Sequence, residues 1–419
     1  MRMGILVVAA FLAPASVVLS GANRVTLTGK VTDATGNPVE HATVMVNHAG
    51  VKKGYSTYCP SCYADCGKRV MTDAAGKFSI ESLDPDLWFK LLVVHDGYAP
   101  VFVEKVDPCK GPSATAVLTV RVAVDDPARV ARGRVVDPHG MPVRDAVVEP
   151  QGVTAIFEGQ KPADMYGEIM GLDPVAVTNS KGEFEIAYAK PALKMLLLVE
   201  ARGMSPKLIS MPTGAERHTV TVSDGATIRG RLVNDSKPVA GAEVGLFPRN
   251  PFFFGPGGLG SPYSEIRIGT QEDGSFAITN VPAPVDWYIY GKMDSIATRG
   301  ATEPIECATK RDDEEVDVGD IQVKPGHRLR GKVVLSDGKP VPEGMRIIIA
   351  SDRDLDSQTA LLGTDGHFEF RGLPTGKYAI SPAVKDYQLP QQTLEASIDR
   401  DIDSLVIVLH PVRRAPSQR

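Results

Sequence analysis

Short stretches in which apolar and polar residues alternate run along the whole chain, separated by turns that contain glycine and proline. Alternation at period two is the pattern of a strand with one buried face. No apolar stripe at the helical period persists over a useful length. The 40 glycines and 32 prolines favour many turns and few long helices. The pattern therefore predicts an all-β protein built of short strands.

The alternating pattern recurs four times. A strand segment with a central glycine, apolar residues two positions to each side and a proline turn behind it repeats at spacings of 104, 97 and 101 residues. The central glycines are Gly29, Gly133, Gly230 and Gly331. Because glycine weakens a strand, its presence there indicates a bulge or the close approach of another segment. We call the four repeats units 1 to 4.

A second signature follows in every unit, namely a tight turn that ends in a glycine with a phenylalanine two residues later. The pairs are Gly76 and Phe78, Gly182 and Phe184, Gly274 and Phe276, and Gly366 and Phe368. The turn predicts a hairpin, and the phenylalanine falls on one face of its second strand, so we expect the ring to point into the core. Units of about 100 residues with such turns predict antiparallel β-sandwiches in tandem.

The repeats divide the chain into six expected segments. Residues 1–22 combine an early cation, an apolar stretch and small residues at the exit, which is the pattern of a secretory signal peptide. An uncleaved anchor is the competing interpretation. The β-sandwiches are expected at residues 23–126, 127–224, 225–325 and 326–411, followed by a basic tail at 412–419. After cleavage we expect no transmembrane helix and a protein that is secreted, periplasmic or at the cell surface.

Unit 1 carries the segment TGKVTDATGNPVEHATVMV followed by TDAAGKFSIESLDP. These segments resemble the carboxypeptidase regulatory-like family, and the other units repeat the pattern, unit 3 with one turn residue missing. The resemblance implies a transthyretin-like, Ig-like β-sandwich in four tandem copies. It also implies non-catalytic modules, which accompany exported peptidases, outer-membrane receptors and adhesins, and for which carbohydrate binding is often inferred.

The chain lacks the motifs of common hydrolases. None of its eight histidines stands three residues before a glutamate, and no HExxH, GxSxG or phosphate-loop pattern occurs. A zinc peptidase needs two or three imidazoles and a carboxylate around an open position. We therefore expect no enzyme activity, no catalytic residue, no cofactor and no metal. The net charge of −5 and the absence of a basic block argue against nucleic acid as a partner.

The most distinctive local feature is YCPSCYADCGKR in unit 1. In an exported protein, disulfides that staple a long loop are the first interpretation, with Cys59, Cys62, Cys66 and Cys109 as candidates. The alternative is an envelope redox or metal-handling protein that uses Cys59, Cys62 and Cys66, because CxxC spacing suits zinc. Redox pairs, however, usually begin a helix, and this one lies between strands. The fifth cysteine, Cys307, is expected to be a buried free thiol.

Units 1 to 3 are 9 to 14 residues longer than unit 4 at one topological position. The insertions hold the cysteine cluster, QKPADMYGEIMGLDP and NPFFFGPGGLGSPY. Long loops on a rigid sandwich often carry binding residues, so we expect a recognition surface there, with Phe252, Phe253, Phe254 and Tyr263 as its binding residues. Packing against a neighbouring unit is the alternative. The ligand is expected to be a glycan, a peptide or a cell-envelope protein, and the oligomeric state stays open.

Other residue patterns have simpler interpretations. Trp88 and Trp287 fall on corresponding strands, so we expect buried or half-buried rings rather than platforms for sugar. Asp352, Asp354 and Asp356 alternate as at the start of an EF-hand loop, but the glycine and glutamate of that loop are missing. Together the patterns predict an exported, non-catalytic rod of four units that acts as a binding or scaffold protein with several weak sites.

Overall fold

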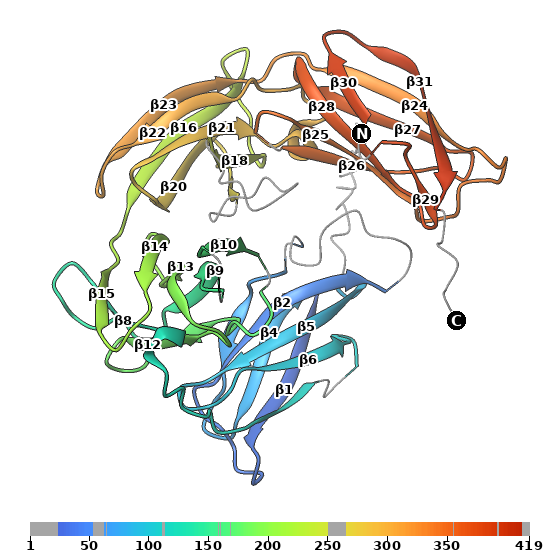
Figure 1. Ribbon diagram of the computed structural model, residues 1–419. Coiled ribbons are helices and arrows are strands. Elements are labelled where there is room, and N and C mark those ends of the chain that lie inside the picture. Colours follow the sequence, from blue (N-terminus) through green and yellow to red (C-terminus); the bar gives the residue numbers. More distant parts are fainter. Residues whose placement is uncertain are drawn as a thin grey trace, which may run out of the picture.

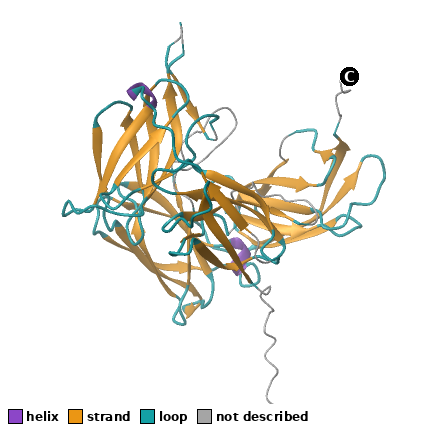
Figure 2. Ribbon diagram, turned by 90° about the horizontal axis from the view of Figure 1, so that it is seen from below, coloured by secondary structure: helices purple, strands orange, loops and turns teal. Residues whose placement is uncertain are grey.

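The computed structural model describes residues 24–52, 63, 65–110, 114–157, 159, 161–167, 169–249, 265–354, 356–391 and 394–412. Within these ranges the chain forms eight β-sheets, which pair into four two-layer sandwiches, each around its own hydrophobic core (Figure 1). The only helices in the described ranges are the 3₁₀ turn η1 (Pro127–Arg129) and the single turn α1 (Met293–Ile296), and strands dominate the view in Figure 2. The predicted all-β fold of tandem sandwiches is confirmed.

Units 1 and 2 each pack a three-stranded sheet against a larger one. The strands of unit 1 are β1 (Val25–Asp33), β2 (Thr43–Val51), β3 (Arg69–Met71), β4 (Lys77–Leu83), β5 (Leu87–Val94), β6 (Val101–Val106) and β7 (Ala114–Leu118). The strands of unit 2 are β8 (Val130–Val136), β9 (Val147–Ala155), β10 (Ala163–Tyr166), β11 (Ala176–Val177), β12 (Glu183–Ala187), β13 (Ala192–Glu200), β14 (Lys207–Pro212) and β15 (Arg217–Thr221). The small sheets run β4-β1-β7 and β12-β8-β15.

Units 3 and 4 each pair two four-stranded sheets. The strands of unit 3 are β16 (Ala226–Asn234), β17 (Lys237–Pro238), β18 (Glu243–Pro248), β19 (Ile266–Gly269), β20 (Ser275–Val281), β21 (Val285–Gly291), β22 (Ile305–Thr309) and β23 (Glu315–Gln322). The strands of unit 4 are β24 (His327–Leu335), β25 (Arg346–Ser351), β26 (Ser357–Leu361), β27 (His367–Leu373), β28 (Gly376–Ala383), β29 (Tyr387–Gln388), β30 (Leu394–Ile398) and β31 (Ile402–Pro411).

The first strand of every unit has the same two neighbours. It pairs antiparallel with the strand that follows the signature turn and parallel with the last strand of the unit, as β1 does with β4 and β7. The parallel pair adds to the antiparallel arrangement that the sequence predicts. Because the first and last strands run in one direction, the chain enters a unit at one end and leaves it at the other, which suits a tandem array.

The two sequence signatures form one packing unit. Gly29 lies directly opposite Phe78 in the β1–β4 ladder, and a Cβ on Gly29 would lie 2.3 Å from the ring carbon Cζ. The equivalent phenylalanines are also only 4 to 6% exposed, and each lies against the glycine of its own first strand. The predicted close approach at glycine and the inward ring are therefore confirmed, and the ring fills the space that a side chain would need.

The units follow an arc rather than a rod. Figure 1 shows unit 1 (blue) turned toward units 3 and 4 (gold to red), and residues of these three units line one common cleft. The predicted rod is wrong. Contacts between neighbouring units fix the angle between them, and that angle bends the array into an arc. Leu92 and Val94 of unit 1 form a separate apolar cluster with Val147 and Val175 of unit 2. Met293, which follows β21, inserts into the core of unit 4.

Candidate functional site

The cleft between units 1, 3 and 4, here called the central cleft, has a volume of about 630 Å³. Unit 1 contributes the residue before β1, the C-terminal end of β2 and the turn before β5. Units 3 and 4 contribute the starts of β18, β19, β25 and β26 and the segment around α1. Its charged lining residues are Arg24, Lys52, Asp65, Asp84, Asp86, Glu243, Arg267, Lys292, Asp294 and Arg346. A cleft at which several domains meet is a common location for binding.

The wall from unit 1 is held by a buried carboxylate. Asp65 forms ion pairs with Arg24 at 3.1 Å and Lys68 at 2.7 Å, and it accepts a hydrogen bond from the backbone N–H of Asp84 at 2.9 Å. Asp84 in turn accepts a bond from the N–H of Asp86 at 2.9 Å. Since these bonds fix the turn before β5, the carboxylates of Asp84 and Asp86 are presented to the cleft.

The opposite wall contains a buried ionic cluster that joins units 3 and 4. The Lys292 ammonium, whose residue is 4% exposed, lies between Glu265 of unit 3, at 2.8 Å, and Asp356 of unit 4. Tyr290 donates its hydroxyl proton to Glu265 at 2.7 Å, and the N–H of Met293 donates to Asp356 at 2.8 Å. The cluster therefore links the wall of the cleft to the junction between the two units.

Burial and the neighbouring charges have opposite effects on the pKa values of this cluster. Burial raises the pKa of Asp356 to about 6, against the opposing effect of the Lys292 charge. Burial also disfavours the charged form of Lys292, yet the two carboxylates beside it together hold its pKa above the ordinary value. Removing either partner would leave an uncompensated charge in the interior. Sequence reasoning took Asp356 only as part of a failed calcium loop, since its partner lies 64 residues away in the chain.

The predicted binding residues Phe252, Phe253, Phe254 and Tyr263 lie outside the described residues, but the bases of their insertion are described. Glu265, which follows the insertion of unit 3, contacts Lys292 at the cleft wall. In unit 1, Lys52 precedes the cysteine insertion and Tyr63 lies within it, and both line the central cleft. The insertion of unit 2 differs, because part of it forms β10, which extends the sheet beside β9.

The structure separates the described cysteines. Cys59 and Cys62 lie outside the described residues, and no disulfide joins Cys66 to Cys109, so that pairing is absent. Cys109 is exposed, with its Sγ 3.5 Å from the carbonyl oxygen of Pro85. Burial, reinforced by the nearby Asp65 charge, raises the pKa of Cys66, whereas a metal or redox thiol needs a lowered one. Cys307 is a half-buried free thiol, with a pKa raised by burial to about 11.

Within the described ranges, no three His, Cys, Asp or Glu side chains are grouped so as to hold a metal ion. The same ranges contain no helix that is long and apolar enough to span a membrane.

Trp287 is fully buried and donates its indole N–H to Thr309 at 3.0 Å. Trp88 is half-buried on the outer face of its strand, with the Lys52 ammonium 5.6 Å from the ring centroid. The expected burial of both rings is therefore observed.

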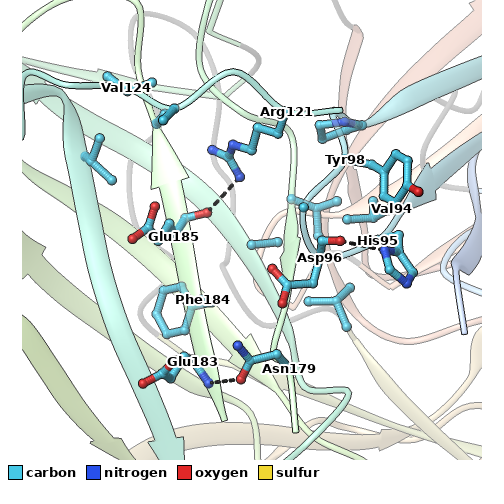
Figure 3. A pocket seen from close by; sticks show the side chains of 18 of the residues that line it. Val94, His95, Asp96, Tyr98, Arg121, Val124, Asn179, Glu183, Phe184 and Glu185 are labelled. Carbon is cyan, nitrogen blue, oxygen red and sulfur yellow. Dashed lines mark hydrogen bonds between the residues drawn. The ribbon is translucent and has the colours of Figure 1, made fainter. Parts of the chain in front are cut away.

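A second space, here called the junction pocket, lies between units 1 and 2 and has a volume of about 290 Å³ (Figure 3). His95 and Tyr98 form one side of it, and Asn179, Glu183 and Glu185 form the other. The motifs of the sequence give no indication of this pocket, because neither unit forms it alone.

Comparison with known families agrees with this architecture. Residues 26–123 match the family model described as carboxypeptidase regulatory-like domain, so the resemblance of unit 1 is confirmed and unit 1 is a domain of that kind. Residues 325–407 match the model described as the second β-sandwich domain of a BOS complex subunit NOMO1-like protein. No curated protein matches the chain.

Several solved structures of bacterial proteins show weak overall similarity to the chain. The Bacillus anthracis TIE protein has a TM-score of 0.19 and 12% identity, over 89% of this chain and 68% of its own. A streptococcal ancillary pilin has a TM-score of 0.22 and 11% identity, over 68% of this chain and 100% of its own. The minor pilin GBS52 of Streptococcus agalactiae has a TM-score of 0.23 and 16% identity, over 47% and 100%. Similarity of this size does not extend to function.

Proposed function

We propose that the protein is an exported, non-catalytic scaffold that holds a protein partner of the cell envelope in the central cleft. The observation that carries this proposal is that three units and the bases of two insertions meet at that cleft. Export rests on the signal-peptide pattern of residues 1–22. The proposed units are 23–126, 127–224, 225–325 and 326–411, with a basic tail at 412–419.

The junctions between units support a scaffold role. The apolar cluster at Leu92 and Val147, together with the ion pair between Arg121 and Asp173, ties unit 1 to unit 2. Between units 3 and 4, a Cβ on Gly372 of unit 4 would lie 2.5 Å from the backbone carbonyl oxygen of Gly300 of unit 3, so the two backbones are in close contact. A scaffold needs such junctions, since a binding surface shared by several units loses affinity if they move independently.

The charges of the central cleft favour a basic segment of the partner. The lining carboxylates Asp84, Asp86, Glu243 and Asp294 form no ion pair within the part of the chain that the structure describes, against a single lining cation without one, Arg346. Lys52 and Arg267 are paired with Asp107 and Glu265. Complementary charge across an interface speeds association and selects partners. Binding at the cleft should therefore weaken as salt is raised.

Site-specific photo-crosslinking in the native envelope tests the proposal. A photoreactive residue at Asp86, inside the cleft, should crosslink to an envelope protein, and one at Glu81, on the exposed face of β4, should not capture the same protein. Asp86→Lys should abolish the complex, while Glu81→Lys, with the same change of charge, should leave it intact. Deletion of residues 250–261 should also abolish it without lowering the melting temperature much. Equal capture from both positions would show that the cleft is not the binding surface.

Nothing in the described part of the chain favours the redox or metal-handling alternative, which would use Cys59, Cys62 and Cys66. The raised pKa of Cys66 opposes thiolate chemistry at that position. Metal analysis of protein purified without chelator separates the two functions, since a stoichiometric metal would support the alternative.

A further inference from the structure

We propose that the junction pocket between units 1 and 2 binds the free N-terminus of a peptide whose first side chain is apolar. Its volume of about 290 Å³ lies at the lower end of ligand pockets, roughly 300 Å³ and above, which suits one terminal residue rather than a longer segment. The pocket shares no lining residue with the central cleft, so this inference stands independently of the partner proposed there.

The charged groups around the pocket neutralise one another except at one position. Three arginines meet three carboxylates in ion pairs, namely Arg121 with Asp173, Arg132 with Glu185, and Arg217 with Glu183 and, at 3.7 Å, with Glu185. Asp96 is the remaining carboxylate of the lining, and it forms no ion pair within the part of the chain that the structure describes. Among the lining residues and their ion-pair partners, one negative charge is therefore in excess, which favours a cationic ligand.

Asp96 lies in the turn that follows β5, and the backbone of this turn is fixed. Nδ1 of His95 lies 2.6 Å from the carbonyl oxygen of Asp96, and since a carbonyl oxygen only accepts, His95 donates this bond. The N–H of Arg121 donates to the carbonyl oxygen of Gly97 at 2.8 Å. Figure 3 shows the Asp96 side chain directed across the pocket toward unit 2. Its carboxylate can therefore accept charge-assisted hydrogen bonds from an ammonium group in the pocket.

Across the pocket, unit 2 presents an oriented amide. Asn179 stands two residues after β11, and its Oδ1 accepts hydrogen bonds from the backbone N–H groups of Lys181 at 2.9 Å and Glu183 at 3.0 Å (Figure 3). Because Oδ1 faces this turn, the Nδ2 group of the same amide remains as a donor. The first carbonyl group of a peptide is attached to the carbon that carries its ammonium. One terminus can therefore donate to Asp96 and accept from Asn179 at the same time.

The floor of the pocket suits an apolar side chain. Val94 and Val175 belong to the apolar cluster that joins units 1 and 2, and both also line the pocket, together with Val124 and Tyr98. The ring of Tyr98 meets that of His95 edge to face, with centroids 5.2 Å apart. An apolar side chain placed here is removed from water, and the walls need no ordering because the contact between the units has already fixed them.

The same groups disfavour related ligands. Acetylation of the terminus removes its charge, so a blocked peptide would cover Asp96 without replacing the water bound to its carboxylate. A free carboxylate adds a negative charge where one is already in excess, so an amino acid should bind more weakly than its amide. Glycine as the first residue leaves the surface of Val94 and Val175 uncovered. The pocket therefore favours the N-terminus of a peptide over a free amino acid.

Methyl NMR of the full chain, with valine methyl groups labelled, tests this inference. Val94 and Val175 report on the junction pocket, and Val51 reports on the central cleft. At about pH 7, where an α-amino group is mostly protonated, leucinamide and leucyl-glycyl-glycine should give saturable shifts at the two pocket valines and none at Val51. Leucine and glycinamide should bind more weakly than leucinamide, and N-acetyl-leucinamide should give no shift. No shift with leucinamide, or equal binding of its acetylated form, would overturn the proposal.

Variants assign the binding to named groups. Asp96→Asn keeps the size of the side chain but removes its charge, so it should weaken leucinamide by roughly tenfold. Asp235→Asn makes the same change at an exposed turn residue of unit 3 outside the pocket, and it should leave the affinity unchanged. Val124→Ala should reduce the preference for leucinamide over glycinamide. Methyl signals outside the pocket report whether each variant is folded. Unchanged affinity in Asp96→Asn, or an equal loss in Asp235→Asn, would contradict the assignment.

Discussion

Lys292 of unit 3 forms a buried ion pair with Asp356 of unit 4. Both residues are less than 5% exposed, and the pair lies beside the central cleft. The two units are thus joined by charge as well as by the insertion of Met293 into the core of unit 4. Because the pair spans two units, its loss affects their relative position as well as their stability.

Removing one partner of this pair should be strongly destabilising. Asp356→Ala leaves the Lys292 ammonium in the interior with Glu265 alone, and such a change costs about 3 kcal/mol of unfolding free energy. The double variant Lys292→Met with Asp356→Leu should recover much of that loss, because it removes both charges. Denaturant unfolding of the full chain measures the unfolding free energy of the single and of the double variant. A double variant no more stable than Asp356→Ala would argue that the pair itself is not the source of the loss.

The raised pKa of Asp356 predicts how its contribution to stability changes with pH. Its pKa is about 6 in the folded chain, above the ordinary value of 3.8, so the folded state takes up a proton before the unfolded state does. The contribution to stability is fully present below the ordinary pKa and is lost as pH rises through about 6. On lowering the pH from 7 to 4.5, wild type should therefore gain stability relative to Asp356→Asn. A difference that stays constant or shrinks on acidification would contradict the assignment.

Because Gly29 lies opposite Phe78, substitution of Gly29 by alanine should destabilise unit 1 more than the same substitution at Gly50. Gly29→Ala would place a Cβ 2.3 Å from the ring and 2.4 Å from the carbonyl oxygen of Ala114, so it should cost about 2 kcal/mol through overpacking. Gly50→Ala in β2 is the matched control, since a Cβ there meets nothing within 4 Å. Thermal unfolding should show a lower melting temperature for the first variant only. Equal melting temperatures would mean that the ring has room to move.

Local signals made much of the fold predictable. In each unit the alternating apolar residues mark the strands, and the glycine turn marks the hairpin, so both are visible in the sequence. The glycine and the phenylalanine then lie opposite each other because their strands are neighbours with a fixed register. Thr72 was missed, although its buried hydroxyl donates to the carbonyl oxygen of Val39 at 2.7 Å and accepts from the N–H of Ala42 at 2.8 Å. Thr178 and Thr270 repeat these bonds, and they stand six residues before the signature phenylalanine in their units. The recurrence of threonine at this position was thus detectable in the sequence. The sequence does not show, however, which carbonyl oxygen accepts the hydrogen bond of the hydroxyl.

The candidate sites were less predictable because they depend on how units meet. Asp356 and Lys292 belong to different units, and no periodicity relates them. Tyr98 and Glu185 come together only through the contact between β5 and unit 2. The insertions were identified by length, and the bases of two of them do lie at the central cleft. The cleft exists because the four units are arranged in an arc. Sequence patterns within one unit do not predict that arrangement.

Cys109 and Cys307, two of the three described cysteines outside a disulfide, should differ in their rate of alkylation. Cys109 is exposed, whereas Cys307 is half-buried. Because its pKa is raised to about 11, Cys307 carries very little thiolate at neutral pH. Iodoacetamide added to the native, non-reduced protein should modify Cys109 first, as read by peptide mass spectrometry. Cys109 that becomes reactive only after reduction would instead place it in a disulfide.

The arc itself predicts a short distance between units 1 and 4. Asp86 and Arg346 line the same central cleft, although they belong to the first and last units. In a rod, two whole sandwiches would separate them, and since a nine-residue strand is about 30 Å long, that distance would be on the order of 60 Å or more. Spin labels introduced as noncanonical residues at these two positions should give a distance distribution well below that value. Labels at Asp86 and Lys181, in units 1 and 2, provide a reference within the first junction. A broad distribution centred at the rod value would show that units 1 and 4 do not share a cleft in solution.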